Sequence, residues 1–126
     1  MSLAGKPGFR LPKNQRLVRA TEFKSTTANN CKSKDALFVV YAKDNNRLFS
    51  RLGVTVSRRV AVKAVERNRI KRVIRESFRH QQGILSGFDV VVIARAVTRQ
   101  VETKQLFVSL EKHWCKVDQQ CKHATL

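Results

Sequence analysis

The sequence predicts an α+β fold, and three observations lead to this class. Two short runs rich in β-branched residues, at 37–42 and 52–57, have the composition of strands. A continuous apolar run at 88–95 has the same character, while residues 62–79 between them change to a helical periodicity. A long helix between two strands indicates a β-α-β unit. We therefore expect one parallel strand pair in an otherwise antiparallel sheet.

The other elements carry weaker local signals. A short helix is expected at 20–27, where it presents Phe23. The strands at 37–42 and 52–57 are connected by Lys-Asp-Asn-Asn-Arg at 43–47, which is rich in turn residues, so the two strands are predicted to pair as a hairpin. A final amphipathic helix is indicated by apolar residues at helical spacing, namely Leu106, Phe107, Leu110, Trp114 and Val117.

The length and composition fit one folded domain. The chain has 126 residues, of which 42% are hydrophobic, and this is too apolar for a disordered basic tail. We expect a basic flexible N-terminal arm at 1–16, a single α+β domain at 17–118 and a flexible C-terminal tail at 119–126. No internal repeat or linker divides the central segment.

The charge balance predicts a polyanionic partner. There are 26 Lys and Arg against 9 Asp and Glu, a formal net charge of +17. Such an excess repels itself in the folded state, and nucleic acid explains it better than an anionic membrane surface. No apolar run approaches the roughly 20 residues of a membrane-spanning helix, and the N-terminus has no signal-peptide core. We therefore expect a cytoplasmic protein with no membrane partner. Its three cysteines, odd in number and unevenly spaced, are expected to be reduced.

The helix at 62–79 places its charge on one side. At 100° per residue its apolar arc is formed by Ile70, Val73, Ile74, Ser77 and Phe78. The opposite arc carries Asn68, Arg72, Arg75 and Arg79, with Lys71 at its margin. A solubilising surface interleaves both signs of charge, whereas this helix has only Glu66 and Glu76 against its many cations. The arc is therefore predicted to bind phosphates, with an ordinary solvated face as the alternative.

Strand parity predicts a second surface, on the side of the sheet away from the apolar core. The residues assigned to it are Thr55, Ile93, Arg95 and, if its strand continues, Arg59, with Tyr41 and Phe23 as candidate aromatics. Single-stranded nucleic acid suits this combination, because aromatic rings stack on bases while basic side chains follow the backbone. The alternative is that both aromatics belong to the core.

The sequence offers no arrangement for catalysis by the chain itself. Its acidic residues are scattered one per element, with no D-x-D or E-x-x-H pattern, and no Gly-rich phosphate loop or nucleophile motif is present. The candidate metal ligands are His113, Cys115, Cys121 and His123. Their spacing matches no familiar zinc signature, so incidental residues near the C-terminus are the preferred interpretation.

The long helix also carries a motif. It contains Arg-Asn-Arg at 67–69, then Ile-Lys-Arg at 70–72 and Arg-Glu-x-Phe-Arg at 75–79. This stretch resembles the signature helix of the bacterial ribonuclease P protein subunit. The likeness extends over roughly 17–117. It includes the strands Arg-Leu-Gly-Val-Thr-Val-Ser and Asp-Val-Val-Val-Ile-Ala-Arg and the Leu-x-x-x-Leu-x-x-x-Trp pattern of the last helix.

The resemblance implies a more detailed fold. Three helices surround a four-stranded mixed sheet in the order α-β-β-β-α-β-α, a two-layer, ribosomal-protein-like fold with a left-handed β-α-β crossover. The additional strand is expected near 27–32, where periodicity alone indicates a loop.

The resemblance also implies a function. The chain is expected to be the accessory subunit of an endoribonuclease in which a catalytic RNA hydrolyses a phosphodiester and removes the 5′ leader of precursor tRNA. Its partners are that RNA and the precursor tRNA, with no protein partner required and a monomer when free. Magnesium is expected at the RNA active site and none on the protein alone.

Two sets of residues match the family's binding positions. The catalytic-RNA set is Arg67, Asn68, Arg69, Lys71, Arg72, Arg75 and Arg79. The set that lines a cleft for the leader is Phe23, Val39, Tyr41, Thr55, Arg59, Ile93 and Arg95. Thr27 stands where relatives often carry a second Phe, so part of the usual stacking surface lacks its aromatic ring.

Other functions remain open on composition alone. A non-catalytic ribosomal or RNA-chaperone protein has the same size and charge, and co-purification with ribosomal subunits would identify it. An independent nuclease needs catalytic groups that the sequence does not offer. Charge alone also permits DNA binding, although the predicted second surface favours a single strand over a duplex groove.

Overall fold

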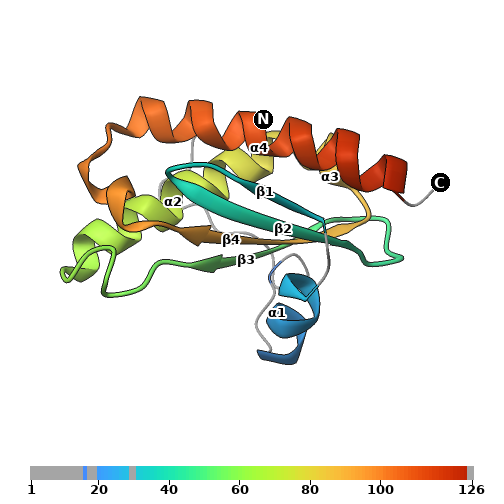
Figure 1. Ribbon diagram of the computed structural model, residues 1–126, viewed down its shortest axis with the longest axis horizontal. Coiled ribbons are helices and arrows are strands. Elements are labelled where there is room, and N and C mark those ends of the chain that lie inside the picture. The colour runs from blue at the N-terminus through green and yellow to red at the C-terminus, as the bar shows by residue number, and fades with distance from the viewer. Residues whose placement is uncertain (1–15, 17–19, 29–30, 125–126) are drawn as a thin grey trace, which may run out of the picture.

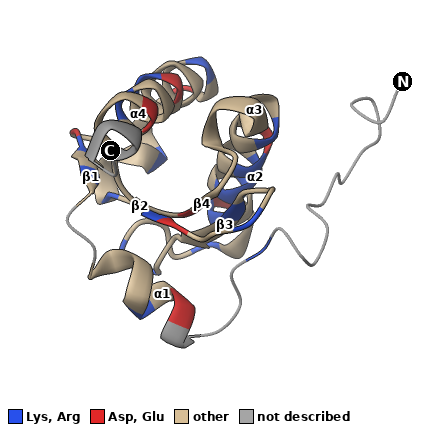
Figure 2. Ribbon diagram, turned by 90° about the vertical axis from the view of Figure 1, so that its right-hand side faces the viewer, with Lys and Arg blue, Asp and Glu red and all other residues tan. Residues whose placement is uncertain are grey.

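The computed structural model describes residues 16, 20–28 and 31–124, and it contains a four-stranded sheet with helices on both faces (Figure 1). The elements in chain order are α1 (Ala20–Thr27), β1 (Lys32–Lys34), β2 (Phe38–Asp44), β3 (Arg51–Thr55), α2 (Ala64–His80), α3 (Gln82–Leu85), β4 (Phe88–Ala94), the 3-10 helix η3 (Ala96–Gln100) and α4 (Thr103–Ala124). Helices α2 and α4 lie on one face of the sheet, and of the described helices α1 lies on the other (Figure 2). The predicted α+β class is confirmed.

The strand order is β1-β2-β4-β3. Strand β4 pairs antiparallel with β2 and parallel with β3, so the predicted parallel pair is confirmed. The predicted hairpin between β2 and β3 is wrong, because β4 lies between them. In β4, Val90, Val91 and Val92 are fully buried, and a strand that is apolar on both faces is stable at the centre of a sheet. The additional strand, β1, begins at Lys32, later in the chain than expected.

The core lies between the sheet and the layer formed by α2 and α4. Alternate residues of β2, beginning with Phe38, are buried against this layer, as the period of two requires. The apolar arc predicted for α2 is buried in full. Trp114 of α4 is also buried, and its Nε1 donates a hydrogen bond to Oγ of Ser77 on α2 over 2.8 Å. This bond satisfies the buried polar atoms of both side chains where α2 and α4 meet.

The chain ends differ from expectation where the structure describes them. Helix α4 continues to Ala124, so 119–124 of the predicted tail is helical, in keeping with the absence of Gly and Pro after Gly87. The predicted arm at 1–16 lies outside the described residues except for Arg16, whose backbone bridges to Leu52 of β3. None of the described helices is both long enough and apolar enough to cross a membrane.

The cysteines are not all reduced. Cys115 is free and exposed, as expected. Cys31 is disulfide-bonded, so the expectation of three reduced thiols is wrong. Pairing of cysteines that are distant in the chain depends on the fold, and spacing in the sequence gives no indication of it.

A buried polar cluster fixes α4 to the beginning of β2. Asp35 Oδ1 accepts hydrogen bonds from the backbone N–H groups of Leu37 and Phe38, both over 2.8 Å. Asp35 Oδ2 accepts a hydrogen bond from Ser109 Oγ of α4 over 2.6 Å. Burial raises the pKa of Asp35, but the hydrogen bonds from Ser109 and these two N–H groups, together with the nearby His113 ring, outweigh burial and lower the pKa to about 2.

His113 of α4 belongs to the same cluster. Its Nδ1 lies 2.7 Å from Ser33 Oγ, and its Nε2 lies 3.2 Å from Asp35 Oδ1 without the alignment of a hydrogen bond. Burial lowers the pKa of His113 from its ordinary value, against the opposing effect of Asp35. A Ser-His-Asp arrangement of this kind is typical of hydrolases. Here, however, Ser33 and His113 are buried, so no substrate reaches them.

We expect the free energy of unfolding to fall as the pH is lowered from about 7 to about 5. The folded pKa of His113 lies below its ordinary value of 6.5, so in this range the unfolded chain binds a proton that the folded protein excludes. Asp35, whose pKa falls from 3.8 to about 2, adds a further loss at lower pH. Urea unfolding at several pH values measures both effects.

The control for this prediction is His80, whose side chain is described and exposed. His113→Gln should flatten the dependence of the unfolding free energy on pH, whereas His80→Gln, at an exposed position, should leave it as it is. Equal pH dependence in the two variants would show that His113 is not the titrating group.

Candidate nucleic-acid interface

The sheet face away from α2 and α4 brings together most of the residues predicted to contact a single strand. Val39 of β2, Ile93 of β4 and Thr55 of β3 form one row across the sheet. Val39 and Ile93 are half-buried and Thr55 is exposed, so this row is accessible. We call these three residues the open sheet face. The strand parity that predicted their common side is confirmed.

Helix α1 covers the neighbouring row, which consists of Tyr41, Val91 and Gly53. The ring of Phe23 lies directly on β3, because a Cβ added to Gly53 would come within 2.6 Å of Phe23 Cζ. Only glycine allows the ring to approach the strand this closely. Phe23 and Tyr41 remain partly exposed, so each presents part of its ring beside the open sheet face.

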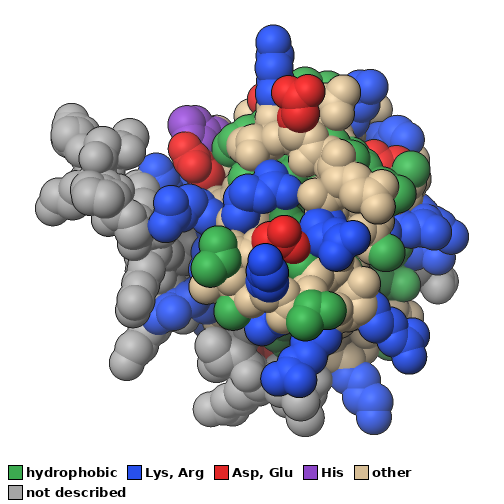
Figure 3. All heavy atoms as spheres, turned by 90° about the vertical axis from the view of Figure 1, so that its left-hand side faces the viewer, with side chains coloured by type: hydrophobic (Ala, Val, Ile, Leu, Met, Phe, Trp, Pro, Cys, Tyr) green, Lys and Arg blue, Asp and Glu red, His purple; other side chains and the backbone are tan. Residues whose placement is uncertain are grey.

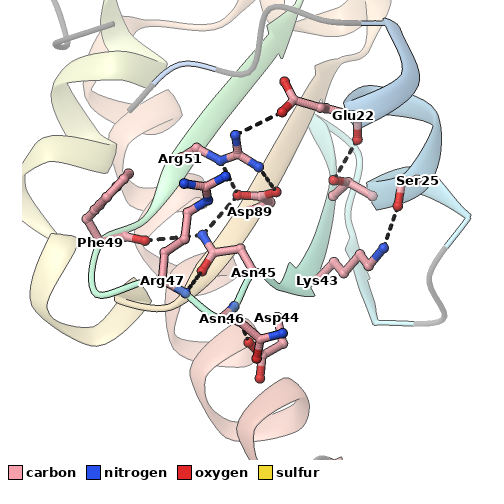
Figure 4. Close-up of polar contacts among 11 residues, drawn as sticks. Glu22, Ser25, Lys43, Asp44, Asn45, Asn46, Arg47, Phe49, Arg51 and Asp89 are labelled. Carbon is pink, nitrogen blue, oxygen red and sulfur yellow. Dashed lines mark hydrogen bonds and ion pairs between the residues drawn. The ribbon is translucent and has the colours of Figure 1, made fainter. Parts of the chain in front are cut away.

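A network of charged groups holds α1 in this position (Figure 4). Arg51 of β3 donates from Nη1 to Oε2 of Glu22 on α1 over 2.9 Å. The same guanidinium makes a two-pronged ion pair with Asp89 of β4, with distances of 2.8 and 2.6 Å. Asn45 Nδ2 also donates to Asp89, and Lys43 donates to Ser25 of α1. Because Glu22 precedes Phe23, this network fixes where the ring lies.

Basic side chains surround the open sheet face, and the sequence indicated only some of them. Lys32 and Lys34 of β1 lie opposite Tyr41 and Val39, and Lys32 Nζ is 5.9 Å from the centroid of the Tyr41 ring. Sequence reasoning missed both lysines because a strand of three residues leaves almost no periodic signal. The alternation Lys-Ser-Lys at 32–34 is the one sign of this strand in the sequence, and the structure buries the serine and exposes both lysines.

The two arginines assigned to this surface differ in how they are placed. Arg95 follows β4 with the parity of Ile93, and its Nη1 donates to the backbone oxygen of Asp35 over 3.1 Å. Arg59 is exposed, but β3 ends at Thr55 and the chain then turns, so strand parity does not place Arg59 on this face. The prediction for Arg59 required β3 to continue as far as residue 59, and the strand ends before it.

The cations of α2 divide into two groups. Arg67 Nη1 donates to the backbone oxygens of Ala61 and Val62 over 3.0 and 2.6 Å and so fixes the loop before the helix. Arg69 donates to Oγ1 of Thr103 and, more weakly, to the oxygen of Arg99. These two arginines therefore hold neighbouring segments in place as well as carrying charge.

Two of the other predicted residues of α2 are more available to a partner. Asn68 and Arg72 are exposed, and no hydrogen bond or ion pair to a described residue holds either side chain. Lys71, Arg75 and Arg79 are half-buried along the same helix. Figure 2 shows the basic residues of α2 in the layer opposite α1. The helix thus carries a basic surface separate from the open sheet face.

The described residues contain no cluster of metal-ligating side chains, that is, no group of three or more His, Cys, Asp and Glu residues that would hold a metal ion. Glu22 and Asp89 approach each other, but Arg51 occupies the space between them. His113 is buried and Cys115 exposed, because positions two apart on a helix face different ways. The side chains of the other two candidate metal ligands, at 121 and 123, lie outside the described residues.

Comparison with known proteins identifies one family. Residues 11–118 match the family model described as Ribonuclease P. The chain is 40% identical over 114 residues to the Ribonuclease P protein component of Methylococcus capsulatus, and the match covers 90% of this chain and 89% of that protein.

Solved structures lead to the same family. A Staphylococcus aureus RNase P protein mutant with defective mRNA degradation activity matches with a TM-score of 0.75 at 33% identity, covering 80% of this chain and 86% of that one. The RNase P protein of Thermotoga maritima matches with a TM-score of 0.69 at 32% identity, covering 77% and 92%. Both the sequence and the fold are therefore shared over most of the chain.

Proposed function

The chain belongs to the family of ribonuclease P protein components, and from that premise we propose that it is the accessory subunit that binds a catalytic RNA and the 5′ leader of precursor tRNA. It thereby assists the endonucleolytic removal of the leader that produces the mature 5′ end. The observation that carries the proposal is the presence of two separate surfaces. An aromatic and basic sheet face suits a single strand, and a cationic helix suits RNA phosphates.

The open sheet face and the residues around it bind the leader. Phe23 and Tyr41 stack on unpaired bases, while Lys32, Lys34 and Arg95 lie where the backbone of the strand passes. Mature tRNA lacks the leader, so contacts on this surface favour the substrate over the product. Selective binding of this kind raises the affinity for precursor tRNA without any catalytic group on the protein.

Helix α2 binds the catalytic RNA. Its arginines offset the repulsion between phosphates of the RNA and the substrate, which lets the RNA active site hold magnesium at a lower bulk concentration. The carboxylates of Glu22 and Asp89 both pair with Arg51, and the described residues contain no cluster of three or more metal-ligating side chains, so no protein ligand for that magnesium is proposed. The chemical step is assigned to the RNA.

The test is cleavage of a 5′-labelled precursor tRNA at low magnesium. Its four arms contain the protein alone, a bacterial ribonuclease P RNA alone, both together, and neither. Cleavage at the mature 5′ end in the combined arm, well above the RNA alone, supports the proposal. If the protein binds the RNA tightly but gives no stimulation, the accessory role is refuted. Cleavage by RNA-free protein would instead place catalysis on this chain.

Gly53→Ala should weaken discrimination between precursor and mature tRNA. The added methyl group displaces the Phe23 ring, since its Cβ would lie 2.6 Å from Cζ. Losing one stacked ring lowers the precursor affinity by about tenfold, and Phe23→Ala should give a similar loss. The measurement is the ratio of the two tRNA dissociation constants for the reconstituted holoenzyme. The double variant should be no worse than either single variant, because both remove the same contact.

Gly83 provides the matched control for this prediction. A Cβ added at Gly83 meets nothing within 4 Å, so Gly83→Ala should keep the native ratio of dissociation constants. Additive losses from Gly53→Ala and Phe23→Ala would mean that the two residues act on different contacts.

A further inference from the structure

A groove lies between α2 and α4, and phosphate binding does not account for its apolar lining. Its volume is about 480 Å³, within the range of small-molecule pockets. Val65 and Val73 of α2 and Phe107 of α4 supply its apolar surface. Asn68, Arg72 and Glu76 of α2 supply polar groups along the same groove. These positions recur every three or four residues, so they form one face of the helix over about three turns.

The apolar part of the groove is open to solvent. Val65 is 79% exposed, although it lies in the first turns of a strongly basic helix. Phe107 is only half-buried, so its ring borders the groove as well as the core. At the end of the molecule where α2 begins, hydrophobic side chains lie among Lys and Arg side chains (Figure 3). A surface that binds only phosphates has no need of exposed valine and phenylalanine.

The polar groups suit the edge of a nucleobase. Asn68 carries both a donor and an acceptor, and the Glu76 carboxylate accepts hydrogen bonds from an exocyclic amino group. Arg72 borders the groove, is exposed and is unpaired among the described residues, so its guanidinium is available to bind a phosphate. A paired A-form helix keeps its base faces stacked and presents mainly phosphates and 2′-hydroxyls to a protein. An unstacked nucleotide offers a flat apolar face, a polar edge and a charge together.

We propose that this groove holds one unstacked nucleobase of the partner RNA while Arg72 binds the adjacent phosphate. The proposal rests on the assignment of α2 to RNA binding and adds that the helix recognises a bulged or looped nucleotide in addition to the backbone. The net charge of +17 and the arginine beside the groove favour RNA over an apolar protein segment as its occupant.

Two RNA hairpins of equal length and charge test the proposal. One is fully paired and the other contains a single bulged 2-aminopurine, whose fluorescence reports stacking. The native protein should bind the bulged hairpin about tenfold more tightly and should change its fluorescence. Val65→Ser, which removes apolar surface from the groove, should lower this preference by about threefold. Phe107→Leu should lower it further, because it removes the ring.

Val62→Ser is the matched control. Val62 is 75% exposed just before α2 but does not line the groove, so its replacement should leave the preference for the bulge unchanged. Equal affinity of the native protein for both hairpins overturns the proposal, as does an equal loss in Val65→Ser and Val62→Ser. This experiment and the cleavage assay test different claims. If the protein prefers the bulged hairpin but does not stimulate cleavage of precursor tRNA, only the accessory role is refuted.

Discussion

Replacing Arg51 with Met should lower the free energy of unfolding by about 3 kcal/mol, the largest effect on stability that we expect from a single surface-proximal charge. The Arg51 and Asp89 side chains are 14% and 10% exposed. Without the guanidinium, the Asp89 carboxylate keeps Asn45 as its one side-chain donor among the described residues and remains buried as an incompletely paired charge. Glu22 also loses its partner, so α1 loses one of its attachments to the sheet.

Urea unfolding of the native protein and three variants measures this effect. Arg47→Met is the control, because Arg47 borders the same pocket but is exposed, and its side chain makes no hydrogen bond or ion pair with a described residue; its Cζ lies 5.9 Å from the centroid of the Phe49 ring. It should change the unfolding free energy by less than about 0.5 kcal/mol. Adding Asp89→Asn to Arg51→Met should restore part of the loss, since the unpaired carboxylate is gone. A loss below about 1 kcal/mol for Arg51→Met would mean that the network contributes little.

The same network should affect function through Phe23. If α1 is held by Arg51, the variant without this ion pair should also show weaker discrimination between precursor and mature tRNA. Arg51→Met acts by loosening the attachment of α1 to the sheet. Gly53→Ala instead displaces the Phe23 ring by a direct clash, while α1 stays attached.

The parts of the fold that were predicted correctly carry periodic signals. The apolar arc of α2 and the buried run of β4 depend on near neighbours in the chain, so composition and spacing are enough to identify them. The pairing of strands is different. The turn-rich segment 43–47 is compatible with a hairpin, but the free energy gained by burying β4 on both faces determines the strand order. That gain depends on contacts distant in sequence.

The same distinction holds for the residues of the candidate site: those in regular strands were predicted, and those that depend on distant contacts were not. Strand parity was enough to place Thr55 and Ile93 on one face, because β3 and β4 are regular. Parity failed at Arg59, where the strand had already ended, and it could not find Lys32 in a strand of three residues. The ion pairs of Arg51 join residues 29 and 38 positions apart, and nothing in the local sequence indicates such pairs. The short helix expected at 20–27 indicated Phe23 as a candidate aromatic, the family resemblance gave it the same role, and the contact with Gly53 explains how its ring is placed.

Replacing Arg67 and Arg72 together with alanine should weaken binding to a bacterial ribonuclease P RNA by about 100-fold. Each arginine is expected to make a charge-assisted hydrogen bond to phosphate that is worth about a factor of ten. The slope of log affinity against log salt should become shallower by about one for each arginine removed, because each one neutralises one phosphate. Filter binding over a series of salt concentrations gives both quantities.

The single variants Arg67→Ala and Arg72→Ala separate the effect on RNA binding from the effect on protein stability, because the two arginines make different contacts within the protein. Arg67 donates to the carbonyls of Ala61 and Val62, so Arg67→Ala should lower both the RNA affinity and the melting temperature. Arg72 holds no described residue, so Arg72→Ala should lower the affinity alone. Arg47→Ala removes an equal charge from the loop between β2 and β3, distant from α2 in Figure 1, and should have little effect on either. If all three variants reduced affinity and salt dependence equally, binding would follow net charge, and α2 would have no special role in contacting the RNA.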